Sequence, residues 1–375
     1  MDLFSNISPL LYSPIYNWLI FGFCMIVVLR YYNVEDNTII YAKPSLPIPA
    51  ITLTVLLILF IGTRPSSYVF GDSYFYQHTY NTFSTDYEIP SLTSEWLWHN
   101  MNTFSKDLGF DAHDFFLFVD LAYFGLMLLC CWRLFPNNTW IAVLFFFASF
   151  SCYTYSVNGI RNGMGTSIIL LAITFLTEKD WKKYLGIVLM LVAFGIHRST
   201  SLPSIAAVTA AFVIKEPKYA IRFWIASIFI SLVAGNAIGY IFAGLGFDDR
   251  MEGYFNMQNN ANEMSRFEST GFRFDFLLYS AMPVLMAWYV TVKRNFKDRT
   301  FNIIANSYIL ANAFWVMVIR AAYSNRFAYL SWFIYPLVIA YPLLRMNIWK
   351  DQDRKTAWIL LAYSGFTFFM FLIGK

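Results

Sequence analysis

His197 and Arg198 stand side by side between two apolar stretches, and the hydroxyls of Ser199, Thr200 and Ser201 follow them. An imidazole titrates near neutral pH, so it can act as a general base or orient an acceptor hydroxyl. A guanidinium is suited to phosphate, because its planar fork donates parallel hydrogen bonds. The alternative is a histidine that caps a helix carbonyl. We take His197 as a candidate catalytic residue and Arg198 as a candidate substrate-binding one.

Arg161 lies in the run Asn-Gly-Ile-Arg-Asn-Gly, which connects two apolar stretches almost without a loop. A charge at such a place is costly unless it is compensated. The arginine also stands near the start of the following helix, where anions are favoured. It could instead reach lipid phosphates or close a helix hairpin. We take Arg161 as a second candidate catalytic residue.

Arg320 and Arg326 bracket a very short connection that contains Tyr323. Two guanidiniums and a phenol that converge there could clamp a pyrophosphate. The alternative is a pair of arginines at the membrane surface, and one of the two is expected to be just that. Arg326 is the stronger candidate, since it opens a helix.

Asp72 and Tyr76 lie in an aromatic run just past the second apolar stretch. Carboxylates and aromatic rings commonly bind sugars, so both are candidate substrate-binding residues. Asp72 could equally be a structural partner of Arg64. Asp120, inside the third stretch, is expected to pair with an arginine or a hydroxyl, and a proton relay through it is a weaker hypothesis.

A metal site is not expected, because the other three histidines, His78, His99 and His113, are widely spaced and lack the close pairs typical of zinc. The chain has no nucleotide-binding P-loop and no serine-hydrolase or zinc-protease motif. No cofactor is predicted. Nucleic acid is not an expected partner either, because no basic cluster lies on a soluble face.

The composition of the chain predicts that these residues belong to a membrane protein. Of 375 residues, 58% are hydrophobic and 13% are charged, whereas soluble domains have about 25% charged residues. Apolar stretches near the roughly 20 residues that cross a bilayer recur along the chain. They predict an all-α polytopic membrane protein, one transmembrane domain over 1–375 with about twelve transmembrane helices. The expected helices lie near 14–30, 47–63, 114–133, 139–157, 162–177, 184–196, 199–214, 223–246, 274–292, 301–319, 327–344 and 357–373.

Lysines fall almost wholly on one side when the connections are assigned alternately to two sides. Lysine-rich loops mark the cytoplasm, and that side holds Lys43, Lys179, Lys182, Lys183, Lys215, Lys218, Lys293, Lys297, Lys350 and Lys355. Two longer outer loops are expected at 64–113 and 247–272. The first contains an amphipathic helix on the membrane face, predicted by the spacing of Leu97, Met101, Phe104 and Leu108. The arginines named above lie at the opposite, outer side.

Several short motifs follow one another along the chain in an order similar to that found in a known family. They are Gly71-Asp72 with Tyr76, Glu95-Trp96-Leu97, Arg161, His197 with Ser199, and Asn325-Arg326-Phe327 with Tyr329. In this order they resemble the EpsG family, bacterial polytopic proteins tied to exopolysaccharide assembly and related to Wzy-like O-antigen polymerases. Many such proteins have Arg-Gln and a small residue where this chain reads Arg161-Asn162-Gly163.

The resemblance implies a polysaccharide polymerase of the bacterial inner membrane. It would transfer a growing undecaprenyl-pyrophosphate-linked glycan onto a lipid-linked repeat unit at the outer face. It also implies an inverting, metal-independent, membrane-embedded glycosyltransferase of the GT-C type. Under this resemblance Arg161, Arg198 and Arg326 hold the pyrophosphate, His197 orients or deprotonates the acceptor hydroxyl, and Asp72 contacts sugar. Expected partners are the undecaprenyl-pyrophosphate-linked oligosaccharide and membrane lipid. Chain-length regulator and flippase proteins are candidate protein partners.

Three other functions stay open. A flippase or transporter of lipid-linked oligosaccharide would also need a cationic cavity, but it should show paired halves with broken helices. A membrane sugar O-acyltransferase would also use histidine, and it would need an acyl-donor path from the cytoplasm. The third alternative is a non-catalytic scaffold in a polysaccharide complex.

Overall fold

The computed structural model describes residues 4, 6–35, 37–82, 86–244, 272–320 and 324–374. Every regular element in these ranges is helical, as the all-α prediction requires. The chain divides into two compact units. Unit 1 comprises Met1–Thr174, Leu191–His197 and Ala340–Lys375, and unit 2 comprises Phe175–Met190 and Arg198–Ile339.

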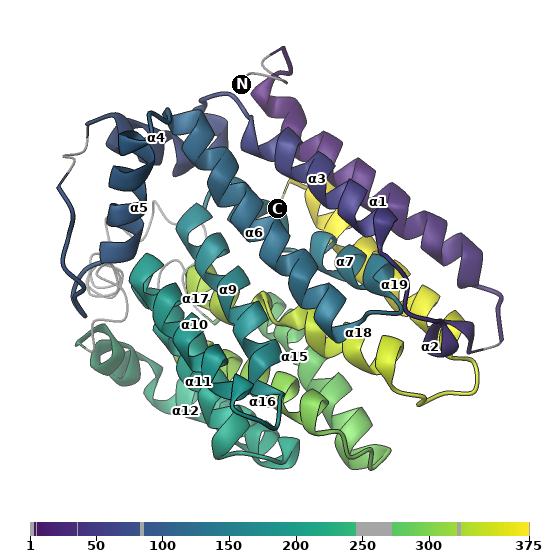
Figure 1. Cartoon of the computed structure of the whole chain (residues 1–375). Helices are drawn as coiled ribbons and strands as arrows, with labels where there is room; N and C mark the ends of the chain where they lie inside the picture. The colour runs from purple at the N-terminus through teal and green to yellow at the C-terminus, as the bar shows by residue number, and fades with distance from the viewer. Residues whose placement is uncertain are drawn as a thin grey trace. The chain divides into compact units, whose positions relative to one another are not determined.

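Four long helices form the body of unit 1, namely α1 (Tyr12–Tyr31), α3 (Ile48–Gly62), α6 (Ala112–Leu134) and α19 (Gln352–Leu372). Helix α3 packs on α6 and α1 packs on α19, as Figure 1 shows. Phe21 stacks on Phe368, with ring centroids 4.3 Å apart. A Cβ at Gly62 would lie 3.1 Å from the Leu117 Cα, so a glycine allows α3 and α6 to approach closely.

The helix expected at 139–157 is broken in two. Helix α7 (Thr139–Phe147) ends and α8 (Cys152–Val157) begins after a short turn. The Tyr16 hydroxyl donates to the backbone carbonyl of Phe147 at 2.7 Å, and the Tyr123 hydroxyl donates to that of Cys152 at 3.2 Å. Because these side chains satisfy carbonyls around the turn, the break is tolerated within an apolar segment.

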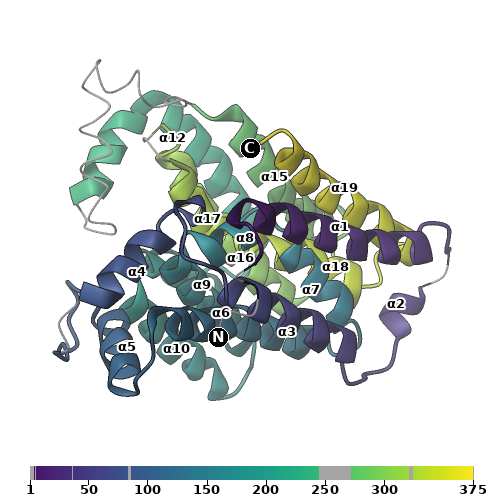
Figure 2. The same cartoon turned by 90° about the horizontal axis from the view of Figure 1, so that it is seen from above.

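The described residues of the segment expected as the first outer loop include two α-helices, α4 (Ser73–Thr82) and α5 (Trp96–Asp107). Helix α5 occupies the place where the apolar spacing predicts one, and its position on a membrane face stays a prediction. The Tyr80 hydroxyl lies 2.9 Å from the Ser105 hydroxyl and joins the two helices. They lie side by side in Figures 1 and 2. Shorter elements of unit 1 are η1 (Pro9–Leu11), α2 (Thr38–Tyr41) and η2 (Tyr68–Phe70).

Helix α16 (Arg299–Met317) is the centre of unit 2. It packs against α11 (Ser201–Phe212), α12 (Pro217–Gly244), α15 (Phe274–Trp288) and α17 (Ser324–Trp332). The buried Asn312 accepts a hydrogen bond from Trp224 Nε1 at 2.7 Å and donates one to Ser331 Oγ at 2.9 Å. These bonds satisfy its amide in an apolar interior and fix the packing of three helices.

Three lysine-rich connections meet at one end of unit 2. Arg299 Nη1 donates to the carbonyl of Thr177, just before Lys179–Lys183. Asn302 donates to the carbonyl of Lys215 at 3.2 Å. These contacts join the connections that precede α10 (Lys182–Ile196), α12 and α16. The three segments therefore share one end, as their predicted common place on the cytoplasmic side requires.

Six helical segments in the described ranges are long and apolar enough to cross a membrane, and one of them joins α17 and α18 (Tyr335–Arg345). They are Pro9–Tyr31, Ala112–Leu134, Pro217–Ala234, Phe274–Lys293, Arg326–Arg345 and Gln352–Leu372. Two shorter apolar helices are Ile48–Gly62 and Ile160–Leu176. This composition is that of a polytopic membrane protein, and the number of about twelve crossings stays a prediction.

The segment expected as one helix at 327–344 forms two helices. Helix α17 ends at Trp332, and α18 follows after two residues. Pro336 lies in the first turn of α18, where a proline is tolerated, but it cannot continue a helix from α17. Two other expectations fall outside the described residues. They are the second outer loop, apart from Phe272 at its end, and the candidate Tyr323.

Candidate active site

Arg161 is the second residue of α9 (Ile160–Leu176), which follows α8 after only Asn158 and Gly159. The sharp connection depends on a close approach of the two helices. A Cβ at Gly163 would lie 2.6 Å from the backbone carbonyl of Tyr155, so only a glycine fits there. The charge of Arg161 is thereby held at the very start of an apolar helix.

Glu95 is the main partner of Arg161. Arg161 Nη1 donates to Glu95 Oε2, and Nε donates to the Tyr76 hydroxyl at 3.3 Å. The guanidinium also lies over the Tyr76 ring, 5.0 Å from its centroid. The carboxylate and the ring compensate a charge that would otherwise be costly at this place.

His197 contacts the other oxygen of the same carboxylate. Its Nδ1 is hydrogen-bonded to Glu95 Oε1. Glu95 therefore bridges Arg161 and His197, although it is 66 residues from the first and 102 from the second. Since a carboxylate held by an arginine accepts hydrogen bonds, His197 Nδ1 is the donor in this contact. Any proton exchange between His197 and a substrate would then use Nε2.

Close packing brings His197 to this position. His197 follows α10, and its backbone N–H donates to the carbonyl of Ala193 at 3.0 Å. A Cβ at Gly195 would lie 3.0 Å from the Leu97 Cβ and 3.2 Å from the Trp96 ring. The end of α10 therefore contacts the start of α5, directly beside Glu95. The Glu95, Arg161 and His197 side chains stay 20%, 22% and 16% exposed, so a ligand can reach them.

Asp72 is brought to the same place by the connection between α8 and α9. Its backbone N–H donates to Asn158 Oδ1 at 2.8 Å. Gly71 has φ +60°, and a Cβ there would lie 2.5 Å from Asn158 Oδ1. Together with Tyr76 and Glu95, Asp72 contributes to the electrostatic environment of Arg161. The structure thus joins four predicted site residues, Asp72, Tyr76, Arg161 and His197, around Glu95, which sequence reasoning had not assigned to the site.

One of the comparisons with known proteins identifies a family for this chain. The model of the EpsG family matches residues 48–374, nearly the whole chain. The chain belongs to the EpsG family. No curated protein and no solved structure matches it. Membership in the EpsG family suggests an exopolysaccharide-related membrane protein and is consistent with a glycosyltransferase-like polymerase.

The other candidate site residues that the structure of this EpsG-family protein describes belong to unit 2. Arg198 begins the short helix η3 (Arg198–Thr200), Arg320 lies just after α16, and Arg326 lies in the first turn of α17. All three are half-buried. Their joint action with Arg161 on one pyrophosphate stays a prediction.

Arg64 and Asp120 form a separate pair, so Asp72 is not the partner of Arg64. Arg64 Nη1 lies 2.7 Å from Asp120 Oδ2, Nη2 donates to Ser73 Oγ at 3.0 Å, and both charged side chains are 2% exposed. The prediction that Asp120 pairs with an arginine or a hydroxyl is confirmed. This pair is sealed from solvent, and its role is to hold α3, α4 and α6 together.

One signal in the sequence pointed to Glu95. It opens the acidic-aromatic motif Glu95-Trp96-Leu97, one of the motifs similar to those of the EpsG family. Nothing in its local spacing identifies which cation it contacts. In the described part of the chain, no three His, Cys, Asp or Glu side chains gather as metal ligands would. Metal independence stays a prediction.

Proposed function

We propose that this protein is a polysaccharide polymerase that transfers a growing undecaprenyl-pyrophosphate-linked glycan onto a lipid-linked repeat unit. The transfer takes place at the outer face of the bacterial inner membrane. The observation that carries the proposal is the Glu95 carboxylate that bridges Arg161 and His197 beside Tyr76. Membership in the EpsG family supports it. The site combines a proton acceptor with an anion-binding guanidinium, the two functions that glycosyl transfer from a pyrophosphate needs.

The proposed step is a single displacement of the GT-C type. The acceptor hydroxyl gives its proton to His197 Nε2 while its oxygen forms a bond to the anomeric carbon of the donor. The bond between that carbon and the pyrophosphate oxygen breaks, and lipid pyrophosphate leaves with the electron pair. Attack opposite the leaving group inverts the anomeric configuration. Glu95 positions the imidazole through Nδ1 and stabilises the imidazolium that forms, in the way a carboxylate supports a catalytic histidine.

The arginines would act on the leaving group. Arg161 would contact the pyrophosphate through Nη2, since its Nη1 and Nε already contact Glu95 and Tyr76. Arg198 and Arg326 would complete the charge neutralisation, with Arg320 and Tyr323 as further candidates. Asp72 and Tyr76 would bind sugar hydroxyls and a sugar face close to the reacting centre.

The test is elongation by the purified protein in liposomes that contain the lipid-linked repeat unit. Mass spectrometry of the released glycans would show a ladder of longer chains for a polymerase. Relocation of unchanged repeat units across the bilayer would instead identify a flippase, and an added acyl mass would identify an O-acyltransferase. Absence of all three, with activity restored only by another protein, would identify a scaffold.

The outer location has a test of its own. Single cysteines are placed at Leu92 and at Lys297 after the four native cysteines are replaced. In intact cells, a membrane-impermeant thiol reagent should label the cysteine at 92 and leave the cysteine at 297 unlabelled. Labelling of the cysteine at 92 alone supports an outer site. Labelling of the cysteine at 297 alone would place the site in the cytoplasm and overturn this part of the proposal.

A further inference from the structure

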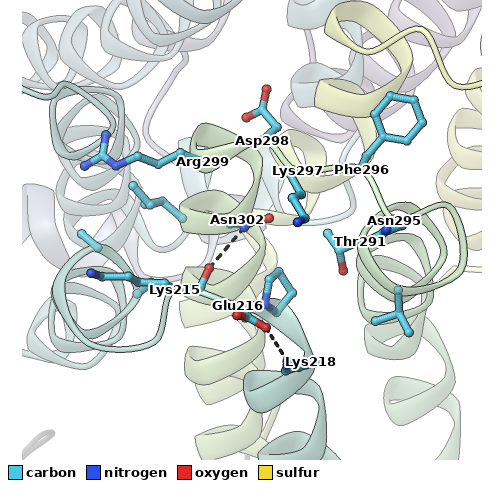
Figure 3. A pocket seen from close by; sticks show the side chains of 15 residues that line it. Lys215, Glu216, Lys218, Thr291, Asn295, Phe296, Lys297, Asp298, Arg299 and Asn302 are labelled. Atoms are coloured by element: carbon cyan, nitrogen blue, oxygen red, sulfur yellow. Dashed lines mark hydrogen bonds and ion pairs between the residues drawn. The ribbon is translucent and has the colours of Figure 1, made fainter.

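A cavity of about 930 Å³ opens at the lysine-rich end of unit 2, separate from the site described above. It is bounded by the end of α11, the start of α12, the π-helical turn η4 (Tyr289–Lys293) and the start of α16, as Figure 3 shows. Its polar lining includes four basic side chains, Lys215, Lys218, Lys297 and Arg299, and two acidic ones, Glu216 and Asp298. The excess of positive charge points to an anionic ligand.

Both acids are already engaged. Glu216 forms an ion pair with Lys218 at 2.6 Å, and Asp298 caps α16 by accepting from the Phe301 backbone N–H at 2.8 Å. Lys215 and Lys297 form no ion pair with any acid among the residues that the structure describes. In Figure 3 Lys297 points into the space beside Asn302 and Thr291, whereas Lys215 extends outward from the edge of the cavity, away from Lys297. Two positive charges therefore remain for a ligand.

The other walls of the cavity are apolar. Ala210, Ala211, Val292, Phe296 and Ile303 line it. On the adjoining turns of α12 and α15, the apolar side chains of Tyr219, Phe223, Leu285 and Trp288 are exposed. A ligand with a charged head and hydrocarbon chains would match both parts, since its chains could follow these exposed faces.

We propose that this cavity binds a phosphate-bearing anion, and that its source is the headgroup of an anionic phospholipid of the cytoplasmic leaflet. Three lysine-rich connections meet at this end of unit 2, which places the cavity at the predicted level of those headgroups. Basic pockets between membrane helices bind such headgroups by charge. The proposal does not depend on the polymerase activity.

Native mass spectrometry of delipidated protein tests the proposal. The protein is titrated with dioleoyl-phosphatidylglycerol, with dioleoyl-phosphatidylcholine and with inorganic phosphate. The first phosphatidylglycerol should bind more tightly than phosphatidylcholine. The double variant Lys215→Gln/Lys297→Gln should weaken it about 30-fold, since each lysine near an anionic surface contributes roughly a factor of five. Lys297→Arg should keep most of the affinity.

The matched control is Lys43→Gln/Lys350→Gln, which removes two lysines from the same predicted side but outside the cavity. It should bind phosphatidylglycerol as the unaltered protein does. Binding of inorganic phosphate alone, abolished by the double variant, would support the anion site and assign it a soluble ligand. Equal affinity of the double variant and the unaltered protein, or an equal loss in the control, would overturn the proposal. All variants should first show unchanged elution and circular dichroism.

Discussion

Two of the arginine–carboxylate pairs of unit 1, Arg64–Asp120 and Arg161–Glu95, differ in what surrounds them. Arg64 and Asp120 are each 2% exposed, and the guanidinium lies 5.9 and 5.3 Å from the ring centroids of Phe70 and Phe116. Arg161 and Glu95 are about ten times more exposed, at 22% and 20%. Among the described residues, the second pair and not the first has a hydrogen-bonded histidine that can exchange a proton, His197.

The difference in exposure indicates that one arginine–carboxylate pair stabilises the fold and that the other can bind a ligand. A sealed pair is held by its own attraction and resists loss of either partner, because the remaining charge would be buried alone. A pair that is open on one side can present its unused donors to a ligand, and its carboxylate can position a neighbouring base. We therefore expect changes at Arg64 and Asp120 to affect stability, and changes at Glu95, Arg161 and His197 to affect turnover.

The largest expected effect is on catalysis by His197. His197→Ala should lower elongation about 10²–10⁴-fold, the usual contribution of a general base. Lipid-linked donor should still bind, and His197→Gln should be equally slow because an amide cannot take a proton. Elongation rates and donor binding in liposomes measure this, with the exposed His78→Ala as the control. Near-full activity of His197→Gln would reduce His197 to a positioning residue.

The second prediction concerns the sealed pair. Arg64→Ala should reduce the free energy of unfolding by about 3–5 kcal/mol, because Asp120 is left charged and buried. Replacing both residues by leucine should cost less than this single change. Denaturant unfolding in detergent measures the difference. If Arg64→Ala unfolds like the unaltered protein but elongates poorly, the sealed pair belongs to the active site and the comparison fails.

Arg161→Lys should lower elongation about 10²-fold, the scale of losing one donor to a developing negative charge. Lysine keeps the charge but cannot contact Glu95, Tyr76 and a phosphate with one planar fork. Unfolding should stay close to that of the unaltered protein, which distinguishes this pair from Arg64 and Asp120. Normal chain elongation by Arg161→Lys would show that the residue serves topology or lipid contact.

The smallest of these effects is expected at Glu95. Glu95→Gln should lower elongation about 10-fold or somewhat more, on the scale of partners that orient a reacting group. The loss should appear in kcat with KM near its original value, and Glu95→Asp should restore part of it. Steady-state kinetics with varied acceptor measure the split. A loss confined to KM would instead indicate that Glu95 binds sugar.

Patterns along the chain were enough for the all-α class, for the presence of several apolar helices of membrane-spanning length and for the identity of Arg161 and His197 as unusual residues. Each of these depends on local hydropathy or on a charge that stands out against it. The broken helix before Tyr335 also had a local cause, since Pro336 cannot continue a preceding helix. The break after Phe147 has no proline or glycine within 148–151 to signal it, and the Tyr16 hydroxyl that satisfies the Phe147 carbonyl comes from another helix, 131 residues away.

The sequence by itself determined which side chains are costly in a membrane and therefore need partners. Only the tertiary structure decided which partners they have. Asp120 and not Asp72 contacts Arg64, and Glu95 contacts both Arg161 and His197 across 66 and 102 residues. The physical reason is that a carboxylate several helices away is equally compatible, by charge alone, with every nearby arginine. The choice among them follows from close helix approaches, at Gly62, Gly163 and Gly195, which bring particular helix ends together.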